Sequence, residues 1–355
     1  MYFCLRLIRK PFLMSEKITI YDIAEKLNIT AATVSRALNN NPKIKESTRE
    51  LVIKTAASMN YKQNKLALAL KSGRSNNIGV IVPRIDSNFF ASVIRGIEEE
   101  LHPHGYQVII CQTHESAKRE NENLYTLIDA QVDGILMSVT DVTGENSGAF
   151  QNVLQKNVPL IFFDRSKHID GVSSVTINDF KGGYITTKHL IDEGCKCIAH
   201  LSGDQSLEIF KNRFLGYKQA LLDNGMQFKE EYVIPVKSFV DAGKDAVEIL
   251  LELETPPDAI FSSSDFAALG AIQELRSRNI IIPKDFCVAG FSNEPFTKFM
   301  ELSITSVDQS PLEMGKMSAR VFLEQVDKTE TIKIEKKVVL APELHIRKSS
   351  SRSNS

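Results

Sequence analysis

The chain of 355 residues contains no tryptophan and only five cysteines. The cysteines are odd in number, scattered and without C-x-x-C spacing, so the sequence predicts neither a disulfide framework nor a zinc site. No apolar run approaches the ~20 residues that a membrane-spanning helix needs. Residues 1–13 carry Arg6, Arg9 and Lys10 and lack a small-residue cleavage site, which makes them a poor export signal. These absences predict a cytoplasmic protein with no metal, no cofactor and no membrane partner.

The formal net charge of −1 conceals a strongly basic N-terminal part. Between residues 17 and 76, eleven Lys and Arg stand against four Asp and Glu, and the remainder of the chain is acidic. A basic segment joined to an acidic body favours a polyanionic partner for that segment alone. A merely solvated basic surface is the alternative interpretation.

Residues 19–39, TIYDIAEKLNITAATVSRALN, predict two short helices joined by a tight turn. Thr19 and Asp22 form an N-terminal cap, and Asn28 tolerates the left-handed conformation of the turn. Thr30 caps the second helix. A third helix over residues 45–60 completes a three-helix core with the apolar face Leu51, Val52, Thr55, Ala56 and Met59.

The second of these helices turns Val34, Ala37 and Leu38 inward, which leaves an outer surface that fits a DNA major groove. An isolated capped pair is equally compatible with a plain helical hairpin. Arg36 is the one long cationic side chain of this helix. We expect it to donate to a guanine edge, with a phosphate contact as the alternative.

The motif IYDIAEKLNITAATVSRALN, the next helix ending in MNY, and NKLALALKSGRSNNIGVIVP closely resemble the LacI (lactose repressor) family of bacterial transcription regulators. The resemblance extends from about residue 17 to residue 347. It implies a small all-α helix-turn-helix domain, a hinge helix and a two-lobed α/β body like that of periplasmic binding proteins. The expected DNA-binding residues are Ile20, Tyr21, Ala31, Ala32, Thr33, Ser35, Arg36, Asn39, Ala67 and Leu70.

Residues 63–76 connect the helical module to the body and contain a short apolar stretch, LALAL. A helix shorter than ~12 residues is marginal in water, so something must bury it. The resemblance implies a hinge helix that folds over the DNA minor groove, with Leu70 as the wedge and Ala67 on the groove floor. A flexible tether is the alternative. Gln63 stands where relatives commonly have proline.

From residue 78 onward, apolar strands alternate with helices, which predicts parallel, doubly wound sheets covered on both faces and arranged as two lobes. Ligands in such folds bind beyond the carboxyl ends of the strands. The predicted segments are a disordered extension 1–16, a DNA-binding domain 17–62, a hinge and linker 63–76, a body 77–347 and a disordered tail 348–355. The first lobe is expected at about 77–176 and 306–333, and the second at about 177–305 and 334–347.

Polar residues at the strand ends, together with aromatic side chains, suit a hydroxyl-rich ligand between the lobes. Each of the polar residues has an alternative role as a cap of the following helix. For Arg213, which the resemblance identifies as the arginine that holds the ligand, the alternative is an interlobe salt bridge. The expected ligand-binding residues are Asn88, Phe89, Asp164, Arg213, Phe239, Ser264, Asp265, Ser292 and Asn293.

Two positions depart from the pattern of sugar-responsive relatives. Ser292 stands where many have aspartate, and Ser264 stands where an amide is frequent. The position of the pocket is therefore better defined than its specificity.

The sequence as a whole predicts a transcription regulator, most simply a repressor of carbohydrate genes. Its expected partners are double-stranded DNA with a pseudo-palindromic operator, a sugar or sugar phosphate, and a second copy of the chain, with a tetramer as the alternative. A nucleobase, nucleoside or protein effector and an activator role remain open. An enzyme is disfavoured because the G-x-S-x-G, P-loop and G-x-G-x-x-G motifs are absent after Ile78. A secreted solute-binding protein is disfavoured by the DNA-binding module.

Overall fold

The computed structural model describes residues 18–62, 73–140, 147–326 and 335–352. The chain divides into two compact units, Met1–Gly73 and Arg74–Ser355, and each is described by itself. The expected extension 1–16, the hinge residues Ala67 and Leu70, and the last three residues of the tail lie outside the described residues. Within the described ranges, no helix has the length and apolar character required to cross a membrane.

Among the described residues of the smaller unit, α1 (Ile20–Leu27), α2 (Ala31–Leu38) and α3 (Glu46–Ser58) pack together. Ile23, Val34, Ala37 and Val52 form the fully buried centre of this small core. The three-helix module predicted from the sequence is confirmed.

The predicted helix ends are also present. The backbone N–H and the hydroxyl of Thr19 both donate to the carboxylate of Asp22, at 2.6 and 2.8 Å. The N–H of Thr33 donates to the hydroxyl of Thr30 at 3.2 Å. Asn28 has φ 50°, the left-handed conformation expected for the turn. These local bonds set the angle at which α2 leaves α1.

The expected core face of α3 is wrong at one position. Leu51 is 52% exposed, whereas its neighbour Val52 is fully buried. Two short helices cover only a narrow stripe of α3, centred on Val52, Thr55 and Ala56. Leu51 lies at the edge of that stripe and faces solvent within the described unit.

The larger unit contains two six-stranded sheets. The first is parallel throughout, and the second is parallel except for its last strand, β12, which runs antiparallel to β10. The first sheet has the order β11-β5-β4-β3-β1-β2 and consists of β1 (Asn77–Val82), β2 (Gln107–Gln112), β3 (Gly134–Met137), β4 (Leu160–Phe163), β5 (Ser173–Ile177) and β11 (Lys337–Leu340). The second has the order β12-β10-β9-β8-β6-β7 and consists of β6 (Ile198–Ser202), β7 (Val233–Pro235), β8 (Ala259–Ser262), β9 (Cys287–Phe291), β10 (Thr305–Asp308) and β12 (Glu343–His345).

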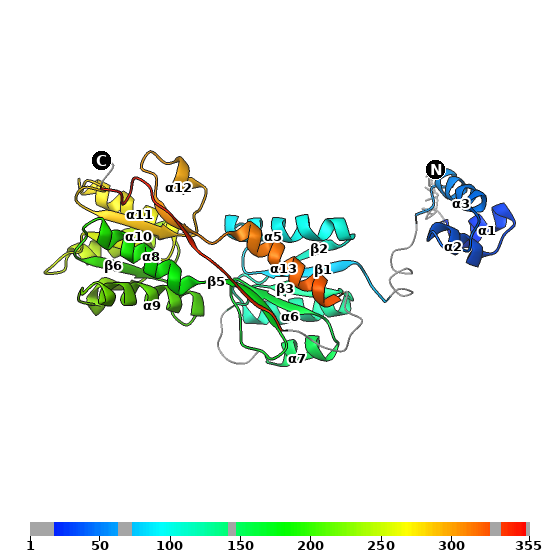
Figure 1. Ribbon diagram of the computed structural model, residues 1–355, viewed down its shortest axis with the longest axis horizontal. Coiled ribbons are helices and arrows are strands. Elements are labelled where there is room, and N and C mark those ends of the chain that lie inside the picture. The colour runs from blue at the N-terminus through cyan, green and yellow to red at the C-terminus, as the bar shows by residue number, and fades with distance from the viewer. Residues whose placement is uncertain (1–17, 63–72, 141–146, 327–334, 353–355) are drawn as a thin grey trace, which may run out of the picture. The chain divides into compact units, whose positions relative to one another are not determined.

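Helices cover both faces of each sheet, as Figure 1 shows. In the first lobe, α5 (Asn88–Leu101) and α13 (Pro311–Val326) pack on one face, and α6 (Ala117–Asp129) and α7 (Ser147–Gln155) pack on the other. In the second lobe, α10 (Val240–Leu251) and α11 (Asp265–Ser277) lie opposite α8 (Asp179–Asp192) and α9 (Glu208–Asp223). The short α12 (Phe296–Phe299) follows β9. The predicted doubly wound, two-lobed α/β fold is confirmed.

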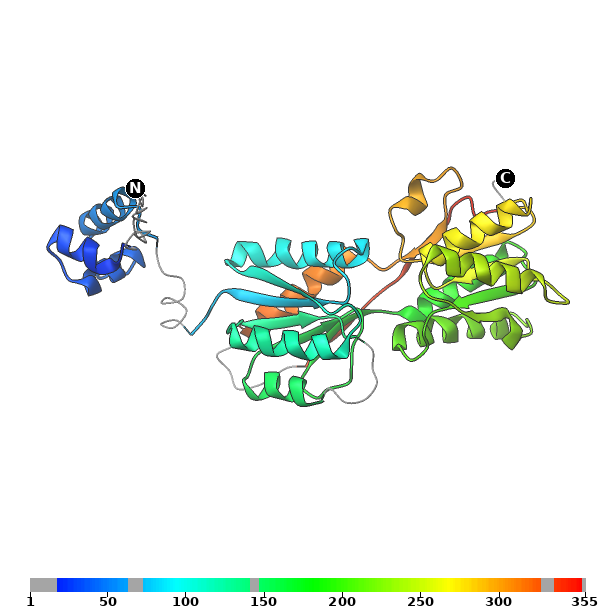
Figure 2. The same ribbon diagram turned by 180° about the vertical axis from the view of Figure 1, so that it is seen from behind.

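The chain passes between the lobes three times, after β5, after β10 and after β11, and the last passage is visible from behind in Figure 2. Two of the expected lobe boundaries are therefore wrong. The second passage follows Asp308 rather than residue 306. β11, expected in the second lobe, pairs with β5 of the first sheet, because Val338 and Leu340 pack against the first lobe's core at this open sheet edge.

The expectation that the tail is disordered from residue 348 is also wrong as far as Arg352. Ser349, Ser350 and Ser351 are buried in the second lobe. The hydroxyl of Ser349 donates to the carbonyl of Val288 at 2.6 Å and accepts from the N–H of Thr305 at 2.9 Å. The polar composition of this segment resembles that of a disordered tail, but the two bonds of the Ser349 hydroxyl fix it to β9 and to the start of β10.

Two glycines allow α5 and α13 to pack closely. A Cβ atom on Gly96 would lie 2.1 Å from the carbonyl oxygen of Leu312, and one on Gly315 would lie 2.1 Å from that of Val93. We therefore expect Gly96→Ala to lower the free energy of unfolding by ~1–3 kcal/mol through overpacking, although alanine favours an isolated helix. Urea denaturation measures this loss.

Gly148→Ala is the matched control, because Gly148 also lies in a helix and a Cβ there would meet nothing within 4 Å. This variant should be neutral or slightly stabilising. Equal stabilities of the two variants would contradict the packing described for α5 and α13.

Candidate nucleic-acid interface and ligand cleft

The outer face of α2 carries the residues predicted to read DNA. Ala32, Arg36 and Asn39 are exposed, and Ala31, Thr33 and Ser35 are half-buried. The guanidinium of Arg36 forms no hydrogen bond or ion pair with other described residues, so it is available for a partner. At the start of α1, Tyr21 is 71% exposed and Ile20 packs partly against the core. The structure thus gathers the predicted residues 20–39 around α2 and the beginning of α1.

Arg213 on α9 is buried in the second lobe and is fully occupied by protein groups. Its Nε donates to Asp179 at 2.8 Å, one terminal nitrogen donates to the carbonyl of Ser263 at 3.1 Å, and the other donates to the side chain of Gln309 at 3.2 Å. The guanidinium also stacks on Phe291, 3.7 Å from the ring centre. Burial raises the pKa of Asp179 to about 6, although the charge of Arg213 opposes this rise.

Asp164 follows β4 and is buried where the first lobe faces the second. Its carboxylate accepts from the hydroxyl of Ser138 at 3.1 Å, and the Nε of Arg165 lies 3.9 Å away. The terminal nitrogens of Arg165 are bound to Glu115. Burial raises the pKa of Asp164 despite the nearby arginines. Asp164 is thus a buried carboxylate without a close, dedicated cation.

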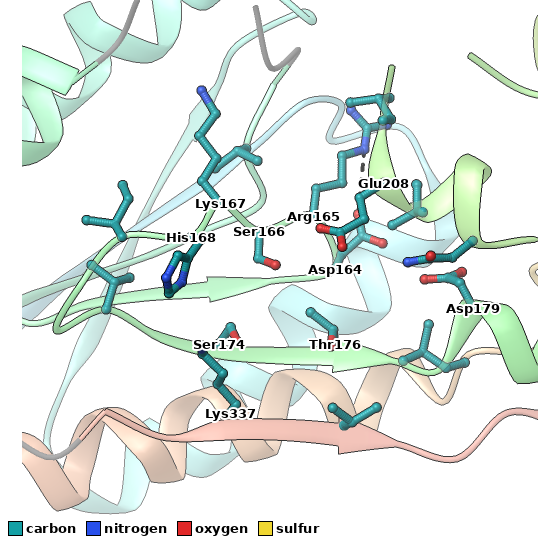
Figure 3. A pocket seen from close by; sticks show the side chains of 18 of the residues that line it. Asp164, Arg165, Ser166, Lys167, His168, Ser174, Thr176, Asp179, Glu208 and Lys337 are labelled. Carbon is teal, nitrogen blue, oxygen red and sulfur yellow. Dashed lines mark ion pairs between the residues drawn. The ribbon is translucent and has the colours of Figure 1, made fainter. Parts of the chain in front are cut away.

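A cavity of about 300 Å³ lies beside Asp164 and is lined by both lobes. Figure 3 shows the carboxylates of Asp164, Asp179 and Glu208 toward one end, and His168 and Lys337 toward the other. The hydroxyls of the β5 residues Ser174 and Thr176 line its floor. This volume lies at the lower end of the range for small-molecule pockets. The lining offers both donors and acceptors, which suits a small polar ligand.

Several predicted ligand residues serve the fold instead of facing this cavity. The side chain of Asn293 accepts from Arg347 at 2.6 Å and donates to Asp308 at 2.7 Å, so both ends of its amide are occupied. The hydroxyl of Ser292 accepts from Gln309 at 3.0 Å. These bonds tie the loop after β9 to the crossover after β10.

Four further predicted residues are also placed away from this cavity. Phe89 is buried in the first lobe's core against Phe90, and Phe239 precedes α10 with 55% of its surface exposed. Ser264 is buried before α11. Asp265 binds the hydroxyl of Ser306 and the N–H of Glu294, and burial raises its pKa to about 7.

The last of the predicted residues, Asn88, reaches across to the second lobe. Its amide nitrogen donates to the carboxylate of Glu294 at 2.9 Å. Of the nine predicted residues, the cavity described above is lined by Asp164 alone.

Sequence reasoning identified Asp179 as a polar strand-end residue but did not include it among the expected ligand contacts, and it missed Glu208 and Asn212, which also line the cavity from the second lobe. A signal was present for each of them. Asp179 is the second residue after β5, a strand-end position like those of the other candidates. Glu208 and Asn212 are four residues apart on α9, so they share one face of that helix. Among the described residues, no group of His, Cys, Asp and Glu could hold a metal ion.

The fold and these sites together define a class of protein. A three-helix unit presents an exposed polar helix face with an arginine that binds no other described residue, and a two-lobed body holds a polar cavity between its lobes. This is the construction of a DNA-binding regulator that responds to a small ligand.

Comparison with known proteins identifies the family. A family model described as periplasmic binding proteins and sugar binding domain of LacI family matches residues 75–342. A second, described as bacterial regulatory proteins of the lacI family, matches residues 19–64. The HTH-type transcriptional regulator DegA of Bacillus subtilis (strain 168) is 32% identical over 338 residues, which make up 95% of this chain and 99% of DegA.

Two solved structures with ligands are also similar. The complex of the transcriptional regulator CelR with cellobiose is 26% identical, with a TM-score of 0.70, and the match covers 94% of this chain and 99% of CelR. A LacI family transcriptional regulator from Enterococcus faecium with bound ribose is 25% identical, with a TM-score of 0.68 and coverage of 78% and 98%. The chain belongs to the LacI family of transcriptional regulators. It is therefore a regulator and not an enzyme, as the sequence predicted.

The buried ion pair predicts a pH-dependent loss of stability in Arg213→Met. The pKa of Asp179 in the folded protein lies above its ordinary value of 3.8. As the pH falls, the folded protein therefore binds a proton at Asp179 before the unfolded chain does. As the pH rises, the carboxyl ionises and lowers the free energy of unfolding. Removing Arg213 raises that pKa further. We expect a loss of ~3–5 kcal/mol at pH 8 and a clearly smaller loss at pH 5, measured by urea denaturation.

Arg278→Met provides the control, because Arg278 is an exposed arginine paired with Glu274 and Glu248. Its loss should be below ~1 kcal/mol and equal at both pH values. A loss for Arg213→Met that does not change between pH 5 and pH 8 would refute this account of Asp179.

Proposed function

We propose that this protein is a cytoplasmic, dimeric repressor that binds a pseudo-palindromic operator and whose DNA affinity is switched by a sugar in the cleft. The observation that carries the DNA-binding part is the exposed outer face of α2 with the unpaired guanidinium of Arg36. An unpaired guanidinium on such a face is suited to bidentate donation to a guanine edge.

The DNA contacts that we propose extend beyond α2. Tyr21, at the start of α1, is exposed and suited to a phosphate contact. In residues 63–76, Leu70 is proposed as the minor-groove wedge and Ala67 as the residue on the groove floor. This combination reads one half-site with the helical unit and the operator centre with the hinge.

A homodimer is supported by the edge of the first sheet. Among the described strands, β2 is the last on its side of the sheet, and it exposes Ile109 by 37% and Ile110 by 48%. An apolar, unpaired sheet edge requires protection from other chains. A second copy of the protein would cover it and would also supply the second half-site reader. A tetramer is the alternative assembly.

The ligand proposal rests on the polar cavity and on the ligands held by similar proteins. Carboxylates at one end and hydroxyls along the floor match a small polyhydroxylated ring. Cellobiose and ribose are bound by the two similar structures described above. We propose Asp164, Asp179 and Asn212 as ligand contacts, with Arg213 orienting Asp179. A sugar phosphate or a nucleobase is the alternative effector.

The base-reading role of Arg36 is testable with operators selected from a random duplex library by the wild-type protein. Arg36→Ala should weaken binding by ~1–3 kcal/mol and relax the preference at one base pair of each half-site. Binding assays on operators with single-base changes measure both effects. Lys54→Ala, at an exposed residue of α3, is the matched control and should leave the base preference unchanged. A loss for Arg36→Ala that is equal on all operators would mean a phosphate contact.

The effector is testable by thermal unfolding with D-ribose, cellobiose, glucose 6-phosphate and hypoxanthine. A ligand at 100 times its Kd stabilises the folded protein by ~2.7 kcal/mol. We expect one of the sugars to raise the Tm and Asp164→Ala to abolish that rise. Asp170→Ala, at a fully exposed position of the same loop, should respond as wild type does. A normal response of Asp164→Ala would remove this residue from the site.

A further inference from the structure

The hydrogen bond between Asn88 and Glu294 joins the two lobes through side chains, in addition to the three chain crossovers. Asn88 is the first residue of α5 in the first lobe, and Glu294 follows β9 in the second. The amide nitrogen of Asn88 donates to the carboxylate of Glu294 at 2.9 Å, across 206 residues of sequence. The bond therefore links the first turn of α5 in the first lobe to the loop after β9 in the second.

The backbone of Glu294 is fixed within the second lobe. Its N–H donates to the buried carboxylate of Asp265 at 2.8 Å. Its carbonyl accepts from the N–H of Thr297 at 2.9 Å and from the hydroxyl of Thr297 at 2.7 Å. With the main chain held on both sides, the side chain of Glu294 is presented to the first lobe in a defined direction.

Burying the carboxylate of Glu294 at this position costs folding free energy. It is 6% exposed, and none of the ion pairs among the described residues includes it. Burial raises its pKa, and the hydrogen bond from Asn88 opposes that rise. A buried carboxylate depends strongly on its remaining partner. The Asn88 amide is that partner, and it is present only while the lobes are together.

We propose that Glu294 and Asn88 form an interlobe latch, in which Glu294 is the positioning residue that holds the two lobes together. The latch itself follows from the contacts described above, and its bearing on a ligand-responsive cleft rests on the proposed function. Because the sequence places serine rather than aspartate at position 292, the loop after β9 lacks the carboxylate expected there. Glu294 supplies a carboxylate two residues later and directs it to the opposite lobe.

Asn88→Asp separates a latch from a local role in α5. Ser87, the N-cap of α5, makes no side-chain capping bond, and an acidic residue in the first turn favours a helix through its dipole. A purely local role therefore predicts that Asn88→Asp leaves α5 intact or stabilises it. The latch predicts that Asn88→Asp weakens the contact between the lobes, because two carboxylates would then face each other across the cleft.

Hydrogen exchange with mass spectrometry on the full chain, without DNA or effector, tests the latch at neutral pH. In Asn88→Asp, we expect exchange about tenfold faster than wild type in the peptides covering residues 86–92 and 292–298, a factor that corresponds to ~1.4 kcal/mol. In the double variant Asn88→Asp, Glu294→Gln, the glutamine amide can donate to the new aspartate. Exchange in both peptides should then return to within about twofold of wild type.

Glu301→Gln is the matched control, since Glu301 is an exposed carboxylate in the same segment of the second lobe. It should leave both peptides unchanged. The latch is refuted if Asn88→Asp exchanges as wild type does, or if the double variant remains as fast as the single one. Because the experiment uses neither operator nor effector, such a failure would leave the proposed function standing.

Discussion

The buried guanidinium of Arg213 is the group on which the connections between the lobes depend. It binds Asp179, the second residue after β5, and Gln309, the first residue after β10. Two of the three passages between the lobes are therefore held by one side chain, which is itself fixed against Phe291. A guanidinium presents its donors in a rigid planar fork, so it holds several partners at fixed angles, whereas the lysine ammonium is a compact charge on a flexible stem. The geometry of these two interlobe crossovers is thus set from inside the second lobe.

A second polar network joins the second crossover to the C-terminal segment beyond β12. Asp308, at the end of β10, binds Asn293 and the N–H of Ser310, and Arg347, beyond β12, binds the other end of the Asn293 amide. The loop after β9, the second crossover and the C-terminal segment are therefore joined. Asp179 lines the cavity and belongs to the first of these networks. The cavity wall and the interlobe crossovers therefore share a residue.

The features that could be predicted from the sequence depend on nearby residues, and those that could not depend on residues far away in the chain. The caps at Thr19 and Thr30 and the alternation of strands and helices were predictable, because they depend on residues a few positions apart. The roles of Asn293 and Ser292 were not, because their position at a strand end does not reveal that Arg347 and Gln309 occupy their polar groups. The prediction of a disordered tail was wrong for the same reason, since the hydrogen-bond partners of Ser349 lie about 45 to 60 residues upstream.

The order in which the two sheets are completed has a consequence for synthesis of the chain. β11 closes the first sheet and β12 closes the second, and the residues up to Arg352 then complete the second lobe's core. Both lobes consequently lack a strand until residues 337–345 have left the ribosome, whereas the helical unit can fold early. A nascent or truncated chain ending near residue 335 would carry a complete DNA-binding unit on a body with two unfinished sheet edges, which are sites for aggregation.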